Sequence, residues 1–172
     1  LLDNIHEALK YEVDVNYQGE AKNKTDVIVI ESINELSKIL DKKYSIVNEL
    51  FFGMFYSELL SNENDTKDTF ISKKYEHFNN LTLQYSGDSL VENLDSFFKN
   101  ELLDAPILNE KTNIKQKAYK TTKISNAPPY LFITLKKYDI TKKSKESYEI
   151  PIDNLNFNKY CIGYDQFDCI IN

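Results

Sequence analysis

The stretch APPYLFITLKKYD, Ala127 to Asp139, places two prolines directly before a run of residues that favour strands. Proline fixes its own φ, pushes the residue before it toward extended geometry, and has no N–H to donate. Strand pairing must therefore begin after Pro129. In a strand over Tyr130 to Tyr138, alternate residues share a face: Leu131, Ile133 and Leu135 on one side, and Phe132, Thr134 and Lys136 on the other. We predict that the two prolines set the register of this strand.

Upstream of this stretch, the first part of the chain is predicted to be largely helical. Leu1 to Lys10 carries apolar residues at helical spacing and predicts an amphipathic helix. The apolar run VIVI, Val27 to Ile30, is expected to be a strand or extended piece, followed by a helix over Glu31 to Leu40. Leu50 to Leu60 is rich in aromatic residues and predicts a strand, in which Gly53 suits a bulge or a close backbone approach.

The second half is predicted to consist mainly of strands. Leu81 to Tyr85 is a short strand candidate, and Ser89 followed by Glu92 forms a capping box for a helix that extends to Leu103. The residues expected to be buried by that helix are Leu90, Leu94, Phe97 or Phe98, and Leu102. YEIPI and FDCII, near the end, look like further strands. Helices first and strands later, without βαβ alternation, indicate an α+β domain.

Composition limits the possible partners. The chain has 172 residues, a hydrophobic fraction of 41% and a net charge of −6, which are ordinary values for one folded domain. All 21 basic residues are lysine, so no guanidinium is present to bind guanine or phosphate in a bidentate manner. No apolar run approaches the roughly 20 residues needed to span a bilayer. We therefore expect no nucleic-acid or membrane partner, and a location in the cytoplasm or nucleus.

The residues that most often carry catalysis or bind metals show no complete site. Cys161 and Cys169 are too widely spaced for a CxxC half-site, and neither has a histidine nearby in the sequence. His6 and Glu7 resemble the start of a zinc HEXXH motif, but Lys10 stands where the second histidine would be. We predict no catalytic residue, no metal ligand and no cofactor within this chain.

Several blocks in a fixed order resemble the ubiquitin-specific proteases, which are papain-like cysteine peptidases that remove ubiquitin from proteins. The blocks are HFNNLTL (His77 to Leu83), SLVENLDSFF (Ser89 to Phe98), AYKTTKI (Ala118 to Ile124) and APPYLFITLKKY (Ala127 to Tyr138). LFFGMFYSEL resembles the start of the family's fingers subdomain, and DNIHEAL resembles the end of its opening glutamine-rich box. The resemblance covers almost the entire chain.

This resemblance implies a partial papain-like fold of the α+β class, with thumb helices, fingers and an antiparallel palm sheet. Residues 1–172 would form one partial domain: 1–49 in the thumb, 50–70 and 104–122 in the fingers, and 71–103 and 123–172 in the palm. The family's catalytic cysteine precedes the opening box and its catalytic histidine follows the final strand. The chain is therefore expected to be an excerpt that lacks both, and to be inactive alone. The fingers' zinc-binding cysteine pairs are also missing.

The resemblance also implies two residues that bind ubiquitin's extended C-terminal tail. Glu7 stands where the family has a tail-contacting carboxylate, and Tyr138 stands where an aromatic residue lines the channel for the tail. Either residue also has a plain structural interpretation, as a solvated helix residue or as the end of a core strand. Asn4 and Ala8 depart from the family's Asp and Phe.

Three functions follow from these observations. The first is part of a deubiquitinase that hydrolyses the isopeptide bond after ubiquitin's terminal glycine, with this segment supplying the palm and fingers that bind ubiquitin. The second is a catalytically dead domain of the same fold that binds ubiquitin or acts as a scaffold, which the changes at Asn4 and Ala8 favour. The third is an unrelated α+β domain.

Overall fold

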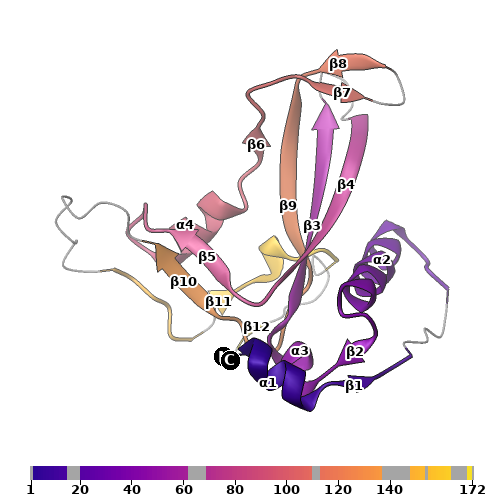
Figure 1. Ribbon diagram of the computed structural model, residues 1–172. Coiled ribbons are helices and arrows are strands. Elements are labelled where there is room, and N and C mark those ends of the chain that lie inside the picture. The colour runs from indigo at the N-terminus through magenta and orange to yellow at the C-terminus, as the bar shows by residue number, and fades with distance from the viewer. Residues whose placement is uncertain are drawn as a thin grey trace.

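A four-stranded antiparallel sheet of order β4–β3–β9–β6 forms the long axis of the molecule (Figure 1). The structure is a computed structural model that describes residues 2–14, 20–61, 69–109, 113–136, 148–153, 155–163 and 170–171. Its helices are α1 (Leu2–Leu9), α2 (Lys24–Ile39), α3 (Ile46–Phe51), α4 (Leu90–Phe97) and the 3-10 helix η1 (Asn158–Tyr160). Its strands are β1 (Tyr11–Glu12), β2 (Lys43–Tyr44), β3 (Gly53–Ser61), β4 (Thr69–Phe78), β5 (Leu81–Gln84), β6 (Glu101–Leu102), β7 (Ile107–Asn109), β8 (Ile114–Gln116), β9 (Ala118–Asn126), β10 (Ile133–Lys136), β11 (Leu155–Asn156) and β12 (Ile170–Ile171).

The long sheet is built around β3, which pairs with β4 on one side and β9 on the other. At its centre Tyr56 lies opposite Tyr75 of β4 and Lys123 of β9. The small hairpin of β7 and β8 lies at the far end of this sheet, in the region that the sequence assigns to the fingers (Figure 1). The α+β class is confirmed, and the division into thumb, fingers and palm stays a prediction.

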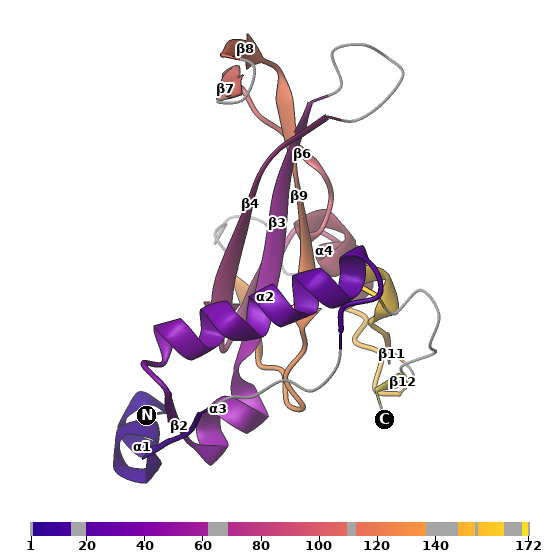
Figure 2. The same cartoon turned by 90° about the vertical axis from the view of Figure 1, so that its right-hand side faces the viewer.

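Helix α2 corrects the expectation that VIVI forms a strand. Asn23 caps the helix by accepting a hydrogen bond from the backbone N–H of Asp26, so the helix starts before VIVI. Ile28, Ser32 and Leu36 then fall on one buried face at intervals of four residues. This face rests on β3 and β9, and Figure 2 shows the helix lying across the sheet. Packing against the sheet outweighs the strand propensity of the β-branched residues.

The strand predicted over Leu50 to Leu60 is partly confirmed. Its first residues belong to α3, a short helix that the sequence interpretation missed, and β3 begins only at Gly53. A side chain at Gly53 would stand 2.4 Å from the ring of Phe78 and 2.8 Å from the Cδ atom of Pro128. The close backbone approach expected at Gly53 is therefore present. Pro128 contacts the start of β3, which ties the two-proline segment to the centre of the sheet.

The strand predicted over Tyr130 to Tyr138 is confirmed from Ile133 to Lys136, where it pairs with β5. Tyr130 to Phe132 precede the strand, so its predicted start is wrong, and residues 137–138 lie outside the described residues. Ile133 and Leu135 face the interior while Thr134 and Lys136 are exposed, as the alternation predicts. The pairing is parallel, with Ile133 opposite Leu81, so the palm is not wholly antiparallel as expected. Helix α4 and strands β6 to β9 separate the two strands in the chain, which gives the crossover connection that parallel pairing requires.

Helix α4 is shorter than predicted. Ser89 accepts the expected hydrogen bond from the Glu92 backbone N–H, but the Glu92 carboxylate accepts its reciprocal bond from Asp88 rather than from Ser89. Leu90 and Leu94 are buried as predicted. The chain then leaves the helix for β6, where Leu102 is 70% exposed, so the predicted burial of Leu102 is wrong.

Two hydrophobic cores lie on opposite faces of β3, because neighbouring strand residues point to opposite sides. The "α4 core" consists of Phe78, Leu81, Leu83, Leu90, Leu94, Ile124, Phe157, Tyr160 and Cys161. The "α3 core" consists of Leu36, Val47, Phe52 and Met54. Met54 belongs to the α3 core, whereas the next residue, Phe55, packs against the α4 core.

Candidate functional site

The two residues predicted to bind a peptide tail have different outcomes. Glu7 is exposed on α1 and accepts a hydrogen bond from Lys10 at 2.5 Å. This hydrogen bond, helped by the lysine charge, holds the pKa of Glu7 below its ordinary value, so the carboxylate is ionised at neutral pH. Tyr138 lies outside the described residues. The position of Glu7 is therefore open to a ligand, and the role of Tyr138 stays a prediction.

Helix α1 is attached to the first turn of α3. The Nδ1 atom of His6 and the hydroxyl of Ser45 are 2.8 Å apart, and Ser45 is the residue that caps α3. The Ser45 hydroxyl also accepts from the backbone N–H of Val47, and Asn48 accepts from the backbone N–H of Ser45. This reciprocal capping box explains why so short a helix forms here. The two helices also lie side by side in both views (Figures 1 and 2).

The other end of α3 holds the segment that leads into β10. The backbone N–H of Tyr130 donates to the carbonyl of Leu50 at 3.0 Å. The ring of Phe51 stacks on that of Phe132, with centroids 5.2 Å apart, and lies 5.8 Å from the ring of Tyr130. Tyr130 and Phe132 are 61% and 48% exposed. Phe51, Tyr130 and Phe132 form what we call the aromatic strip.

Helix α3 thus joins the helix that carries Glu7 to the strand segment that precedes Tyr138. The exposed residues of these three elements include Tyr130 and Phe132 of the aromatic strip, Ile46 and the carboxylates of Glu7 and Glu49. Large rings bind apolar side chains and carboxylates attract basic ones. The arrangement is suited to binding a polypeptide that carries both.

Sequence reasoning missed both α3 and the aromatic strip. The spacing of Ser45 and Asn48 fits a capping arrangement, so the start of α3 left a detectable signal. The aromatic strip left none, since Phe51 and Phe132 are far apart in the chain and only the fold brings them together.

Cys161 is the one of the two cysteines that lies within the described residues, and the sequence predicts that it is not a catalytic nucleophile. Its side chain is only 5% exposed and belongs to the α4 core, so it is not accessible to a protein substrate. Cys169 lies outside the described residues. His77 stacks on the ring of Phe52, a residue of the α3 core, with centroids 6.0 Å apart.

Two kinds of feature are absent from the described part of the chain. Among those residues, no group of three or more histidine, cysteine or acidic side chains is arranged to hold a metal ion. Within the same ranges, no helix combines the length and the apolar character needed to cross a membrane.

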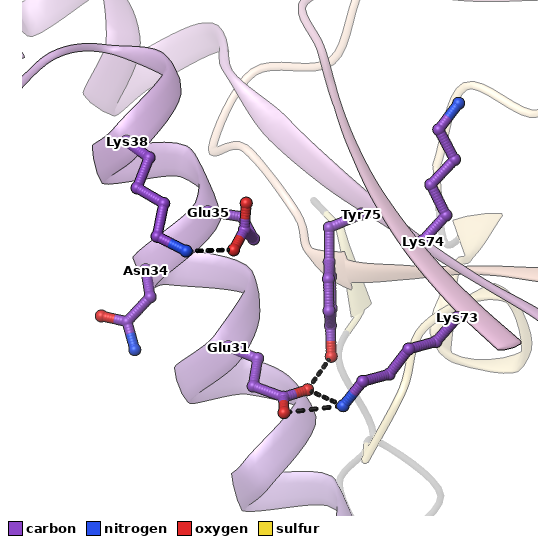
Figure 3. A pocket seen from close by; sticks show the side chains of 7 residues that line it. All are labelled: Glu31, Asn34, Glu35, Lys38, Lys73, Lys74 and Tyr75. Carbon is purple, nitrogen blue, oxygen red and sulfur yellow. Dashed lines mark hydrogen bonds and ion pairs between the residues drawn. The ribbon is translucent and has the colours of Figure 1, made fainter.

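A hollow of about 550 Å³ lies between α2 and the outer strand β4 (Figure 3). The Glu31 carboxylate accepts two bonds from Lys73, at 2.5 and 2.6 Å, and one from the hydroxyl of Tyr75 at 2.5 Å. These bonds lower the pKa of Glu31, and burial together with the Glu31 carboxylate raises the pKa of Tyr75. With its carboxylate already bound, Glu31 acts as a clamp between helix and strand.

Comparison with known proteins identifies relatives over nearly the whole chain. The family profile described as ubiquitin carboxyl-terminal hydrolase matches residues 1–167. A probable ubiquitin carboxyl-terminal hydrolase of Acanthamoeba polyphaga mimivirus is 28% identical over 165 residues, which cover 84% of this chain and 35% of the viral protein.

Solved structures agree with this match. The SAGA Ubp8/Sgf11/Sus1/Sgf73 DUB module bound to ubiquitin aldehyde contains a chain that is 25% identical, with a TM-score of 0.56 and coverage of 84% of this chain and 34% of that one. A further structure of the module, at 22% identity, has a TM-score of 0.65 over 97% of this chain and 34% of that one, which shows a likeness of fold. The chain therefore spans about a third of the length of the relatives it matches.

Proposed function

The chain belongs to the ubiquitin carboxyl-terminal hydrolase family, and from this premise we propose that it is part of a cysteine-type deubiquitinase, in which it supplies a surface that binds ubiquitin. The parent protein would act in the cytoplasm or nucleus. The isopeptide bond after ubiquitin's last glycine would be attacked by a thiolate, with a histidine as base, and both groups would come from outside these residues. The third possibility, an unrelated α+β domain, is excluded by the family match.

One observation carries this proposal: α3 holds the helix of Glu7 at one end and the start of the strand toward Tyr138 at the other. The family resemblance assigns exactly these two positions to contacts with the ubiquitin tail. The exposed rings of the aromatic strip belong to the segment held at one end of α3, and the exposed, ionised Glu7 belongs to the helix held at the other. A chain terminus with apolar and basic side chains would be bound by both features.

Titration of the 172-residue chain into isotope-labelled ubiquitin, followed by NMR, tests the binding. We expect shifts that concentrate on ubiquitin's C-terminal tail and the surface around it. Phe132→Ala should weaken binding about tenfold, since exposed aromatic anchors often carry much of an interface's free energy. Glu7→Gln should weaken it about two- to threefold.

A matched control is Leu102→Ala, which removes an even more exposed apolar side chain on β6, away from the aromatic strip. It should leave the affinity unchanged. Binding that is unaffected by Phe132→Ala and Glu7→Gln, or equally affected by Leu102→Ala, would contradict the assignment of the surface.

A thiol-reactive ubiquitin probe tests the division of labour. The 172-residue chain should not react, whereas a longer protein containing it and a catalytic cysteine should. Labelling of Cys161 or Cys169 would overturn the roles assigned here.

The alternative, a domain that binds ubiquitin without catalysis, is favoured by Asn4 and Ala8. Both are exposed on α1, so the departures from the family pattern change the surface of the helix and leave its packing intact. Ubiquitin binding by the longer protein without cleavage of a fluorogenic ubiquitin substrate would support this alternative.

A further inference from the structure

Helix α1, which carries Glu7, buries little of its own surface against the rest of the protein. None of the residues Leu2–Leu9 is fully buried. Leu2 is partly buried and packs against the α3 core, whereas Ile5 and Leu9 are 39% and 51% exposed. Apolar packing alone therefore holds this helix weakly, and a polar contact has more influence on its position than it would on a buried helix.

His6 makes such a contact. Within the described ranges, the 2.8 Å contact between His6 Nδ1 and the Ser45 hydroxyl is the one side-chain hydrogen bond that connects α1 to another element. Ser45 is only 2% exposed and caps α3. The histidine ring is therefore bonded to a residue whose own position is fixed by the fold.

The partners of the Ser45 hydroxyl determine which atom donates in this bond. A hydroxyl has one proton to donate and two lone pairs that accept. The Ser45 hydroxyl donates to Asn48 Oδ1 at 3.2 Å and accepts from the backbone N–H of Val47 at 3.2 Å. One lone pair remains for His6. All three contacts are hydrogen bonds only when Nδ1 of His6 carries a proton and donates it.

The direction of Glu7 is coupled to this bond, because the two residues are consecutive on one helix. Consecutive side chains of an α-helix are about 100° apart around its axis. The ring of His6 is directed at Ser45, and the Glu7 side chain, 62% exposed, projects to solvent beside it. A rotation of α1 about its axis would break the bond at Ser45 and turn Glu7 away from its present direction.

We propose that His6 is a positioning residue for the binding of ubiquitin's tail: its Nδ1–H donates to Ser45 and thereby holds the Glu7 carboxylate in the direction from which it contacts the tail. This inference rests on the proposed function, in which Glu7 binds the tail. His6 acts through Glu7 and not by a contact of its own with ubiquitin.

Long-range ¹H–¹⁵N NMR spectra of the free, isotope-labelled 172-residue chain test the hydrogen bond without ubiquitin. At about pH 9, where an ordinary imidazole is neutral, the ring proton of His6 should reside on Nδ1. The chain has two histidines, so the signals that His6→Asn removes belong to His6 and those that remain belong to His77. A proton on Nε2 of His6 would overturn the proposal, whether or not the chain binds ubiquitin.

Titration into labelled ubiquitin tests the action through Glu7. His6→Ala should weaken binding about two- to threefold, as Glu7→Gln does, because both changes remove the contribution of the same carboxylate. Adding His6→Ala to Glu7→Gln should cause no further loss. Losses that add in the double variant would show that His6 acts independently of Glu7, and would overturn the proposal.

His6→Asn is the conservative variant. The asparagine amide nitrogen takes the place of Nδ1, two bonds from Cβ, and asparagine resembles histidine in helix propensity. It should therefore keep the affinity of the unchanged chain. A loss equal to that of His6→Ala would mean that a donor at this position is not what matters, which contradicts the proposal.

Ser57→Ala is a control for general destabilisation, since it removes the 3.0 Å hydrogen bond between Ser57 and Thr122, which joins β3 to β9 away from α1. It should lower the melting temperature and leave the affinity for ubiquitin unchanged. An affinity loss equal to that of His6→Ala would contradict a specific role for His6. Lack of binding by the unchanged chain would refute the proposed function, whereas binding that His6→Ala leaves intact would refute this inference alone.

Discussion

The two cores on opposite faces of β3 differ in how completely their apolar residues are buried. The α4 core is built from α4, β5, β10 and the segment around Cys161, and aromatic rings such as Phe98 pack over its edge. The α3 core is smaller and borders both the exposed aromatic strip and a cavity at Leu36. The more tightly packed core therefore lies away from the candidate binding surface. At that surface, apolar side chains stay exposed and available to partners.

Despite this difference, each core has at its edge a carboxylate that is bonded to a tyrosine hydroxyl and a lysine. On the α3 side, Glu31 bonds to Tyr75 and Lys73, and on the α4 side Asp95 bonds to Tyr160 at 2.7 Å and Lys159 at 2.6 Å. In each case a carboxylate on a helix ties down a tyrosine whose ring packs inside. The two cores therefore differ in their packing more than in their electrostatic interactions.

The largest test compares one truncation in each core. Leu94→Ala, at a fully buried position, should lower the free energy of unfolding by about 4 kcal/mol, because tight surroundings leave a cavity. Leu36→Ala should lower it by about 2 kcal/mol, because Leu36 already borders open space. Urea denaturation monitored by circular dichroism measures both.

The exposed Leu102 supplies the control for this pair, and Leu102→Ala should change the free energy of unfolding by less than about 0.5 kcal/mol. Equal losses of unfolding free energy for Leu94→Ala and Leu36→Ala would mean that the two cores are packed alike. That result would contradict tighter packing in the α4 core.

A second test acts where the cores meet. Gly53→Ala should lower the free energy of unfolding by about 2 kcal/mol, since the new methyl group would overlap the ring of Phe78 and contact Pro128. Phe78→Leu in the same chain should recover part of that loss, because it removes the ring that the methyl meets. A double-mutant cycle in urea measures the coupling, and additive losses would show that the overlap is relieved in some other way.

The smallest expected effect is the dependence of stability on pH. Hydrogen bonds from lysine and tyrosine lower the pKa of both Glu31 and Asp95 below their ordinary values of 4.5 and 3.8. A carboxyl group with a lowered folded-state pKa stabilises the protein above its unfolded pKa, and this contribution is lost as the pH falls through the folded value. The free energy of unfolding should therefore decrease below about pH 4.5.

Glu31→Gln should remove more of this acid dependence than Asp95→Asn, because the Glu31 side chain is 36% exposed and that of Asp95 52%. Solvent screening should keep each contribution below about 1 kcal/mol. Denaturation curves at pH 7 and pH 3.5 measure the difference, and a larger effect at Asp95 would reverse the predicted order.

The local sequence pattern predicted the secondary structure correctly where one face of an element is buried against a single neighbour. The alternation of Ile133 to Lys136 and the cap at Ser89 are both seen in the structure. The prediction of a strand at VIVI was wrong. These strand-favouring residues lie inside α2, because Asn23 caps the helix and the helix buries one face. Strand β4 was missed because charged residues such as Lys73 and Lys74 interrupt its apolar alternation at the sheet edge.

The candidate site shows the same limit. Glu7 was named through a family resemblance and is exposed on α1, whereas the aromatic strip was not foreseen.

The sequence by itself determined the α+β class, the family resemblance and the alternation of Ile133 to Lys136, because periodicity acts over a few neighbouring residues. Only the tertiary structure decided that Pro128 contacts Gly53 and that Phe51 stacks on Phe132. These contacts join residues far apart in the chain. Their formation depends on packing strong enough to offset the entropy of closing long loops, and no local pattern records that balance.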